Sequence, residues 1–364
     1  MDQNRYSNVY TAVSARQWDF ISQDNLTAKE AVAFLLDGIQ LRSFRDILRQ
    51  VCGTDMVERQ LTEGLLAMAP PNVHPDSIRR KIRNWMNGKA LPTDREDVFQ
   101  ICFSLALEPE QAERMLTFLT DQGIHYRNPR EMVYAYCLRY HLGYRHACRL
   151  AEQMPGPKYA ANTHREPVTQ VIHRQFQDVR AEEDLYSFML RHQPFLGSTH
   201  NTAYGYFCQM LTLLTGEGLE GEGRYSMEYV ADTYLRMNVP QEKRSARYND
   251  IQKMVKKYWP GPRSIKAMKA RSEDVTRKTL LLLYLVTGGI WNQEYDELDE
   301  TYITAKEFME THCNRMNQML RACGMRRMDP RNAFDYMVLY CLRPENDRFM
   351  SDRMADLAAE LFCE

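Results

Sequence analysis

The sequence predicts an all-α protein, with an N-terminal helical bundle followed by one or two larger helical bundles. Apolar residues recur at spacings of three and four in one segment after another, and no stretch alternates continuously as a half-buried strand does. Helix-start residues recur as well, and we expect N-caps at Thr27, Thr93, Asn128 and Asp329. With 364 residues and 44% apolar content, the chain can fill more than one core.

These patterns define the expected helices in chain order. Thr27 with Glu30 makes a capping box at the first, and Thr93 with Glu96 makes another before the helix that starts near residue 93. The expected helices cover residues 27–39, 43–51, 56–68, 77–87, 93–107, 109–120, 129–154, 168–176, 182–193, 202–214 and 279–287. The last of these is apolar on nearly every side, so we expect a central core helix that ends at the glycine pair after it.

Pro and Gly cluster too densely for regular structure at residues 154–167, 215–223 and 259–263. We expect three consecutive domains: an N-terminal helical domain over residues 1–125, a middle helical domain over 126–222 and a C-terminal helical domain over 223–364.

One pattern occurs twice in the chain. Residues 128–130 (NPR) precede a helix that contains residues 136–139 (YCLR), and residues 329–331 (DPR) precede one that contains residues 340–343 (YCLR). Two interpretations stay open. An Asn or Asp N-cap followed by Pro is a common way to start a helix, so these are two similar buried helices, or the chain contains a duplication.

Composition and leader sequence argue against a membrane or secreted protein. The mean hydropathy is −0.55, and the chain has no apolar run long enough to cross a bilayer. Its first residues, MDQNRYSNVY, lack the basic and apolar regions of a secretion signal. The nine cysteines include no C-x-x-C pair, as expected of reduced core residues. We therefore expect a cytoplasmic protein with no membrane partner.

Metal and catalytic motifs were sought in the same way. His312, Cys313 and Cys323 are close in sequence but lack the paired spacing of a zinc site, so we expect no metal. The phosphate-loop, dinucleotide, H-E-x-x-H and G-x-S-x-G motifs do not occur. We expect a protein that is not an enzyme and binds no cofactor.

The segment that points to a partner is residues 77–107. Five cations lie within residues 77–89 with no acid among them, while Ile78, Ile82 and Trp85 keep the spacing of one apolar helix face. One face of this helix should therefore pack, and the other should present cations to something anionic. The alternative is a basic, solvated helix in an ordinary bundle.

This segment resembles the end of the Cro/C1-type (lambda-repressor-like) helix-turn-helix, whose recognition helix ends in W-x-x-G-K before x-x-P and a further helix. The matching residues here are Trp85, Gly88, Lys89 and Pro92, and the next helix carries Val98, Ile101, Cys102, Leu105 and Leu107. The resemblance extends over residues 43–121. It departs from the family at residues 69–76, where an eight-residue connection replaces a turn of three or four.

The resemblance implies a recognition helix that enters the major groove of double-stranded DNA, with Arg favouring guanine and Asn favouring adenine. The implied DNA-binding residues are Ser77, Arg79, Arg80, Lys81, Arg83, Asn84 and Lys89. Pairing two half-sites through a homodimer is the usual route of such proteins to useful affinity. The C-terminal half from Arg271 is similar to uncharacterised helical proteins of anaerobic Gram-positive bacteria, which implies no activity.

A second basic stretch spans residues 243–278, where twelve Lys or Arg face three acids, a local balance of +9. The residues that we assign to this second basic patch are Lys253, Lys256, Lys257, Arg263, Lys266 and Lys269. One interpretation is a second nucleic-acid contact. The other is a solvated helix pair whose charge is balanced by the acids at residues 294–310, of the same chain or of a partner subunit.

Two functional hypotheses follow. The first is a DNA-binding transcriptional regulator that uses the basic helix as its recognition helix and the helical remainder for oligomerisation or for binding a protein partner. The second is a non-enzymatic helical adaptor of a mobile-element or phage-defence system, which uses the same bundles to hold other proteins.

Overall fold

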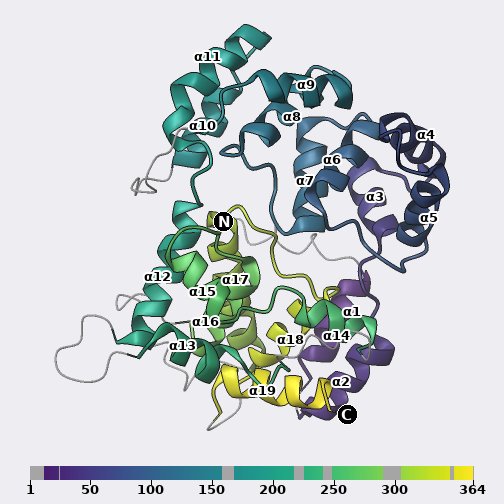
Figure 1. Cartoon of the computed structure of the whole chain (residues 1–364). Helices are drawn as coiled ribbons and strands as arrows, with labels where there is room; N and C mark the ends of the chain where they lie inside the picture. The colour runs from purple at the N-terminus through teal and green to yellow at the C-terminus, as the bar shows by residue number, and fades with distance from the viewer. Residues whose placement is uncertain are drawn as a thin grey trace, which may run out of the picture. The chain divides into compact units, whose positions relative to one another are not determined.

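The computed structural model describes residues 12–23, 25–157, 168–216, 225–240, 248–289, 305–344 and 348–363. Among these residues every regular element is a helix, and the one isolated β-bridge joins Gln122 to Met325 (Figure 1). The predicted all-α class is therefore confirmed. No helix in the described part of the chain is long and apolar enough to span a membrane.

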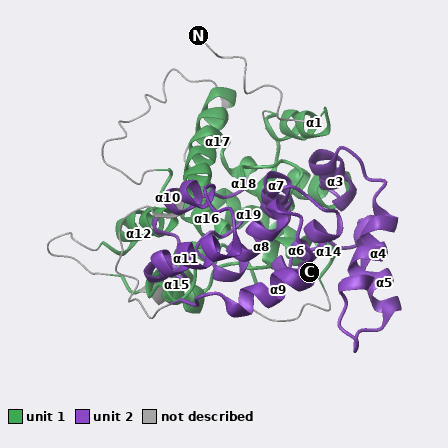
Figure 2. Cartoon of the chain, turned by 90° about the horizontal axis from the view of Figure 1, so that it is seen from above, with its two compact units in different colours: residues 1–41, 202–323, 327–364 green, residues 42–201, 324–326 purple. Residues whose placement is uncertain are grey.

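The chain divides into two compact units, which Figure 2 colours separately. Unit 2 comprises residues 42–201 and 324–326, and unit 1 comprises residues 1–41, 202–323 and 327–364. The helices of unit 2 are α3 (Phe44–Cys52), α4 (Glu58–Met68), α5 (Pro75–Met86), α6 (Arg95–Ser104), α7 (Pro109–Thr120), α8 (Pro129–Arg139), α9 (Tyr144–Gln153), α10 (Val168–Phe176) and α11 (Glu182–His192).

The helices of unit 1 come from both ends of the chain. They are α1 (Ala12–Ile21), α2 (Ala28–Ala33), α12 (Asn201–Thr215), α13 (Met227–Val230), α14 (Asp250–Lys256), α15 (Pro262–Lys269), α16 (Arg277–Val286), α17 (Ala305–Ala322), α18 (Ala333–Cys341) and α19 (Met350–Leu361). Short π-helical turns extend α2 over Phe34–Gly38 and α13 over Ala231–Leu235, and a 3-10 turn at Gln193–Phe195 follows α11.

These units do not coincide with the three consecutive domains expected from the sequence. In unit 1 the N-terminal helices pack with the C-terminal ones. The Tyr336 hydroxyl donates to Ala31 O and the Tyr340 hydroxyl donates to Leu26 O, each over 3.1 Å. Such pairings join residues some three hundred positions apart. No local pattern encodes them, and Pro- and Gly-rich loops mark only where helices end.

The core helix predicted at residues 279–287 is α16. Its residues Leu280 through Leu285 are fully buried, and the chain turns away through Gly288 and Gly289, both with positive φ. In unit 2 the core of the first helices gathers around Phe44 and Trp85, whose rings meet edge-on with centroids 6.0 Å apart.

Two of the four predicted N-caps are confirmed and two are wrong. Thr27 caps α2 and Asn128 caps α8. The cap of α6 is Asp94, one residue after Thr93, and the cap of α18 is Asn332, three residues after Asp329. In both wrong cases two good capping residues lie close together, and the choice between them depends on tertiary contacts of the helix that follows.

The single helix predicted over residues 129–154 is also wrong. It is interrupted between α8 and α9, where His141 adopts a left-handed conformation with φ of 53° and the N–H of Leu142 donates to Cys137 O over 2.8 Å. Gly143 then supplies the N-cap position of α9.

Candidate nucleic-acid interface

The basic helix predicted at residues 77–87 is α5, which begins two residues earlier, at Pro75. His74 occupies its N-cap, and the imidazole Nδ1 accepts a hydrogen bond from the N–H of Asp76 over 3.3 Å. Pro at the first helical position and an acid in the first turn both favour a helix start here. The connection from α4 to α5 therefore covers residues 69–74 and is shorter than the expected connection over residues 69–76.

The end of α5 is a Schellman turn built on Gly88, whose φ is +71°. The N–H of Lys89 donates to Asn84 O over 2.9 Å, and the N–H of Gly88 donates to Trp85 O over 3.1 Å. This geometry fixes where the chain leaves the helix and places Lys89 just beyond its last turn.

The inner face of α5 is buried. Ile82 is 1% exposed and Trp85 is 3% exposed, and both belong to the core formed with α3 and α4. Arg45 of α3 donates from Nε to Met86 O over 2.9 Å, which holds the C-terminal turn of α5. The prediction that Trp85 anchors this helix inward is confirmed.

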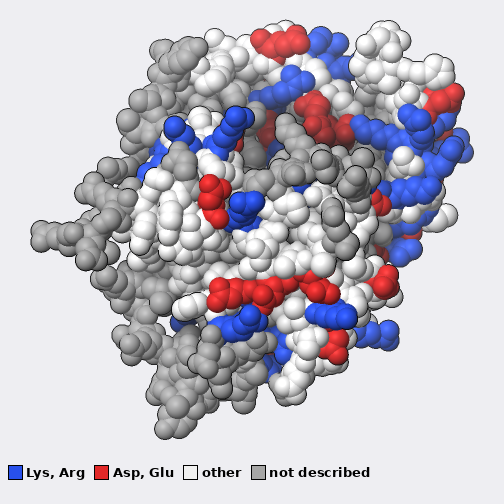
Figure 3. Space-filling model, turned by 60° about the horizontal axis from the view of Figure 1, so that its bottom comes forward, with Lys and Arg blue, Asp and Glu red and all other residues white. Residues whose placement is uncertain are grey.

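The outer face of α5 carries the predicted DNA-binding residues. Asn84 is half-buried, and the others are exposed: Ser77, Arg79, Arg80, Lys81, Arg83 and Lys89. Figure 3 shows Lys and Arg gathered at the right-hand edge of the molecule, on the side where Figure 1 places α4 and α5. The structure thus brings all seven residues to one helix and the turn after it.

Ion pairs divide these cations into two groups. Arg79 Nη1 lies 2.9 Å from Asp76 Oδ1, and Lys81 Nζ lies 2.6 Å from Asp97 Oδ1 on α6. Lys81 Nζ also lies 5.2 Å from the centre of the Trp85 ring. The second group, which we call the unpaired triad, has no acidic partner among the described residues and consists of Arg80, Arg83 and Lys89.

Sequence reasoning treated all five cations alike. The Arg79–Asp76 pair has the ordinary spacing of three within one helix and was readable from the sequence. The Lys81–Asp97 pair crosses from α5 to α6 and depends on how the two helices pack, so no local spacing reveals it.

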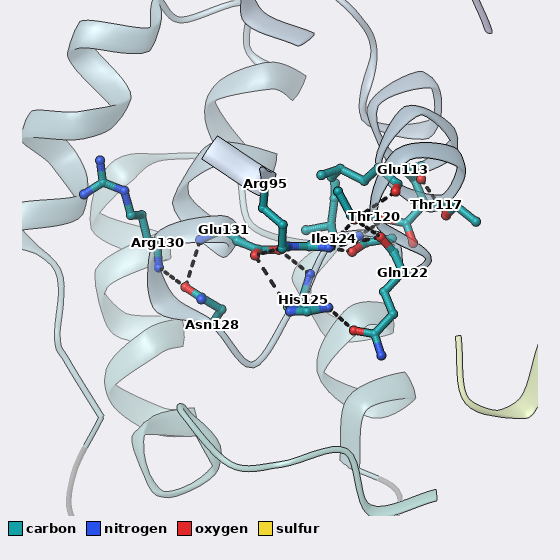
Figure 4. A network of polar contacts seen from close by, with 12 residues as sticks. Arg95, Glu113, Thr117, Thr120, Gln122, Ile124, His125, Asn128, Arg130 and Glu131 are labelled. Atoms are coloured by element: carbon teal, nitrogen blue, oxygen red, sulfur yellow. Dashed lines mark hydrogen bonds and ion pairs between the residues drawn. The ribbon is translucent and has the colours of Figure 1, made fainter. Parts of the chain in front are cut away.

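A polar network holds α6, and with it Asp97, in place (Figure 4). Arg95, the first residue of α6, donates to both carboxylate oxygens of Glu131 on α8, over 2.7 and 2.6 Å. The same guanidinium donates to Gln122 O and Gly123 O, and Glu131 accepts the N–H of His125 over 2.7 Å. The loop between α7 and α8 is therefore fixed by one arginine.

Glu113 closes the other side of that loop, where its carboxylate accepts the N–H of Ile124 over 2.7 Å (Figure 4). Burial raises the pKa of Glu113 to about 7, against the hydrogen bond from Ile124 and the charge of Arg95, which both lower it. This carboxyl group therefore titrates near neutral pH.

The second basic patch lies in unit 1 and also divides into two groups. On and after α14, Lys253 Nζ lies 3.3 Å from Asp250, Lys256 Nζ lies 4.6 Å from the Tyr248 ring centre and Lys257 Nζ lies 4.9 Å from that of Tyr258. On α15, Arg263 and Lys266 are exposed and Lys269 is half-buried. The acids at residues 294–300, which one of the two interpretations assigns to balance this charge, lie outside the described residues.

His312, Cys313 and Cys323 are buried in unit 1. His312 is 3% exposed, and its Nδ1 is 2.8 Å from the Tyr284 hydroxyl. Burial lowers the pKa of His312 to about 4 and raises the pKa of the Cys313 and Cys323 thiols to about 12. Within the described ranges, no three His, Cys, Asp or Glu side chains are grouped to hold a metal ion.

Comparison of the chain with protein-family models, with curated proteins and with solved structures gives no match in any of the three.

Proposed function

We propose that the protein binds double-stranded DNA through the outer face of α5 and acts as a transcriptional regulator, with its other helices available for oligomerisation or for a protein partner. The observation that carries the proposal is the unpaired triad of Arg80, Arg83 and Lys89. Arg80 and Arg83 lie on the exposed side of a helix whose opposite side is buried, and Lys89 lies in the turn that follows it. A helix held in this way presents its charges in a fixed arrangement.

The pairing pattern supports phosphate contact. Arg79 and Lys81 are already held by acids of the same unit, so they add less to the attraction of a polyanion than the unpaired triad does. Each phosphate that the triad neutralises on duplex DNA releases counterions and makes affinity fall more steeply with salt. The adaptor hypothesis has no comparable observation in its favour.

The test is the salt dependence of binding to labelled random-sequence duplex DNA, measured by fluorescence anisotropy. Replacing Arg80, Arg83 and Lys89 together by Ala should lower the slope of log affinity against log salt by roughly two to three, at about 0.9 per lost phosphate contact. The matched control replaces three exposed arginines on α9, α10 and α11 of the same unit, Arg149, Arg174 and Arg191.

The control variant removes the same charge and should keep the wild-type slope. If the α5 variant and the wild type give the same slope, the contact is not on α5. If the wild type itself has no salt-dependent affinity for duplex DNA, the proposal is wrong and the adaptor hypothesis replaces it.

A further inference from the structure

Helix α15 of unit 1 repeats the pattern of α5 of unit 2. The core side of α5 carries Ile82 and Trp85, and that of α15 carries Ile265 and Met268, all at most 3% exposed. Each residue of the second pair follows its counterpart by 183 positions. At the same offset, Arg80 corresponds to Arg263 and Arg83 to Lys266, and all four side chains are exposed.

The two helices also end with the same backbone turn. The left-handed residue is Gly88 after α5 and Arg271 after α15, with φ of 71° and 57°. The N–H of the next residue closes the turn in both: Lys89 donates over 2.9 Å, and Ser272 donates to Ala267 O over 3.0 Å. These positions keep the offset of 183, so the correspondence covers main chain as well as side chains.

The helices that follow, α6 and α16, correspond at an offset of 182. Both begin with an arginine, Arg95 and Arg277. After α6 the left-handed residue is Ala106, and after α16 it is Gly288. The closing bond runs from Leu107 N to Cys102 O in one and from Gly289 N to Tyr284 O in the other, over 3.0 Å in each.

Each of these arginines binds an acid in the third position of a later helix. Asn128 caps α8 and Asn332 caps α18, and three residues on lie Glu131 and Asp335, the partners of Arg95 and Arg277. Each guanidinium also donates to a loop carbonyl: Arg95 to that of residue 123 in unit 2, and Arg277 to that of residue 327 in unit 1. The acid accepts the N–H of residue 125 or 329. The two caps, the two acids, the two carbonyls and the two N–H groups are each 204 positions apart.

The loop before each capped helix is held by a side chain of the preceding long helix. Glu113 of α7 accepts the N–H of Ile124 over 2.7 Å, and Asn317 of α17 accepts the N–H of Met328 over 2.8 Å. The offset is again 204 for both the acceptor and the donor. An amide performs in unit 1 the task of a carboxyl group in unit 2.

The repeated YCLR segments anchor a further pair of elements. Tyr136 donates to Arg180 O just before α11, and Tyr340 donates to Leu26 O just before α2. The residues that follow, Ala181 and Thr27, are N-caps whose N–H donates to an acid three residues on. Thus α10 and α11 correspond to α1 and α2. Helices α1 and α2 nonetheless lie in unit 1 with α15–α18, whereas α10 and α11 lie in unit 2 with α5–α8.

We infer that the chain carries one helical arrangement twice, in which α10, α11 and α15–α18 repeat α1, α2 and α5–α8, and that α15 is the second copy of α5, a second surface for the phosphate backbone of duplex DNA. This assignment rests on the function proposed for α5. On α15, Arg263 and Lys266 have no acidic partner among the described residues. One chain then holds two contact helices, where related binding motifs usually need a dimer.

The test compares three pairs of cations, on α15, on α5 and on α14. The α15 pair is Arg263→Ala with Lys266→Ala, and the α5 pair is Arg80→Ala with Arg83→Ala. The control on α14 is Lys253→Ala with Lys256→Ala, whose cations are engaged by Asp250 and Tyr248. Each pair removes the same charge from the full chain, and binding to duplex DNA is measured by anisotropy at several salt concentrations.

Each of the α5 and α15 pairs should lower the slope of log affinity against log salt by about two, the combined variant by about twice that, and the α14 pair should change little. A wild-type slope for the α15 pair beside a lowered slope for the α5 pair overturns this inference and leaves the proposed function intact. A lowered slope for the α15 pair alone contradicts the proposed function of α5 instead.

If neither pair changes the slope, both assignments fail. If the α14 pair changes the slope as much as the α15 pair, the assignment of α15 fails. Thermal melts followed by circular dichroism check that each variant is folded. A second α15 variant, Arg263→Glu with Lys266→Glu, reverses the charge on the same exposed face and should weaken binding further than the alanine pair.

Discussion

In each unit an arginine donates to both carboxylate oxygens of its acid, Arg95 to Glu131 and Arg277 to Asp335, but the two pairs differ in burial. In unit 2 the side chains are 25% and 9% exposed, and in unit 1 they are 3% and 0% exposed. In both, the arginine joins the start of one helix to the third residue of another and bonds the carbonyl of the intervening loop. The two units therefore fix a loop in the same way. The contribution of the arginine–acid pair to the free energy of unfolding depends on how exposed the pair is to solvent.

Helices α5 and α15 differ in a similar way. Helix α5 has 12 residues and an additional first turn, whereas α15 has 8 and begins at Pro262. The shared part is the apolar anchor, the two exposed cations and the closing turn. The comparison indicates that the anchor and the turn position the cations, and that the first turn of α5 is an addition to this common unit.

The largest expected effect comes from breaking the buried pair. Asp335→Ala leaves the Arg277 guanidinium buried without its carboxylate, which should cost about 3 to 5 kcal/mol in the free energy of unfolding. Glu131→Ala should cost only about 1 to 3 kcal/mol, because Arg95 keeps its bonds to Thr120 and to loop carbonyls and is partly hydrated. Urea titrations of both variants measure the difference, and an equal or reversed order would refute the burial argument.

The next effect is a pH dependence of stability in unit 2. Glu113 and Asn317 accept corresponding loop N–H groups, but only Glu113 can titrate. Because burial raises the pKa of Glu113 from 4.5 to about 7 in the folded protein, the folded state favours the protonated form. The contribution to stability is complete below pH 4.5 and is lost as pH rises toward 7, by about 3 kcal/mol at 1.36 kcal/mol per pKa unit.

Glu113→Gln keeps an oxygen that accepts the N–H of Ile124 and removes the titration. The difference in unfolding free energy between this variant and the wild type should therefore change in the variant's favour between pH 4.5 and 7. Urea titrations across this range test it. A difference that does not vary with pH would show that Glu113 titrates at an ordinary pKa.

The smallest effect concerns the left-handed residues that close α5 and α15. Gly88 has open space around it, so Gly88→Ala should cost about 1 kcal/mol from backbone strain alone. Arg271→Gly relieves the same strain but removes a guanidinium 4.0 Å from the Tyr204 ring centre, so its net change should be near zero. A Gly88→Ala variant as stable as the wild type in thermal denaturation would show that the turn is not held in the left-handed region.

Local patterns in the sequence predicted the helices of unit 2, apart from the break between α8 and α9, and the inward face of α5. Ile82 and Trp85 have the spacing of a packed face, and the run at residues 279–287 is apolar on all sides, so both are readable without tertiary information. The exchange of α1 and α2 into unit 1 was not predictable, because it depends on hydroxyl-to-carbonyl bonds from Tyr336 and Tyr340 across most of the chain.

The sequence showed part of the internal repeat, namely the two YCLR segments, but not which capping residues correspond. When Pro129 is aligned with Pro330, the two YCLR segments have unequal spacings, so the sequence left a duplication and two similar helices as open interpretations. The structure aligns Asn128 with Asn332 as the caps, and the two YCLR segments then keep the same offset of 204. Asp329 misled the sequence reading because it accepts the N–H of Arg331 in a turn just before the true cap.

The central claim, that α5 and α15 are equivalent contact helices, is tested most directly by photo-crosslinking. A photoreactive amino acid is placed in the full chain at one position at a time, in place of Arg80, Arg263 or, as a control on α14, Lys253, and irradiated with labelled duplex DNA. We expect covalent protein–DNA adducts from positions 80 and 263 and only background from position 253. Background from both 80 and 263, or adducts from 253 alone, would contradict the claim.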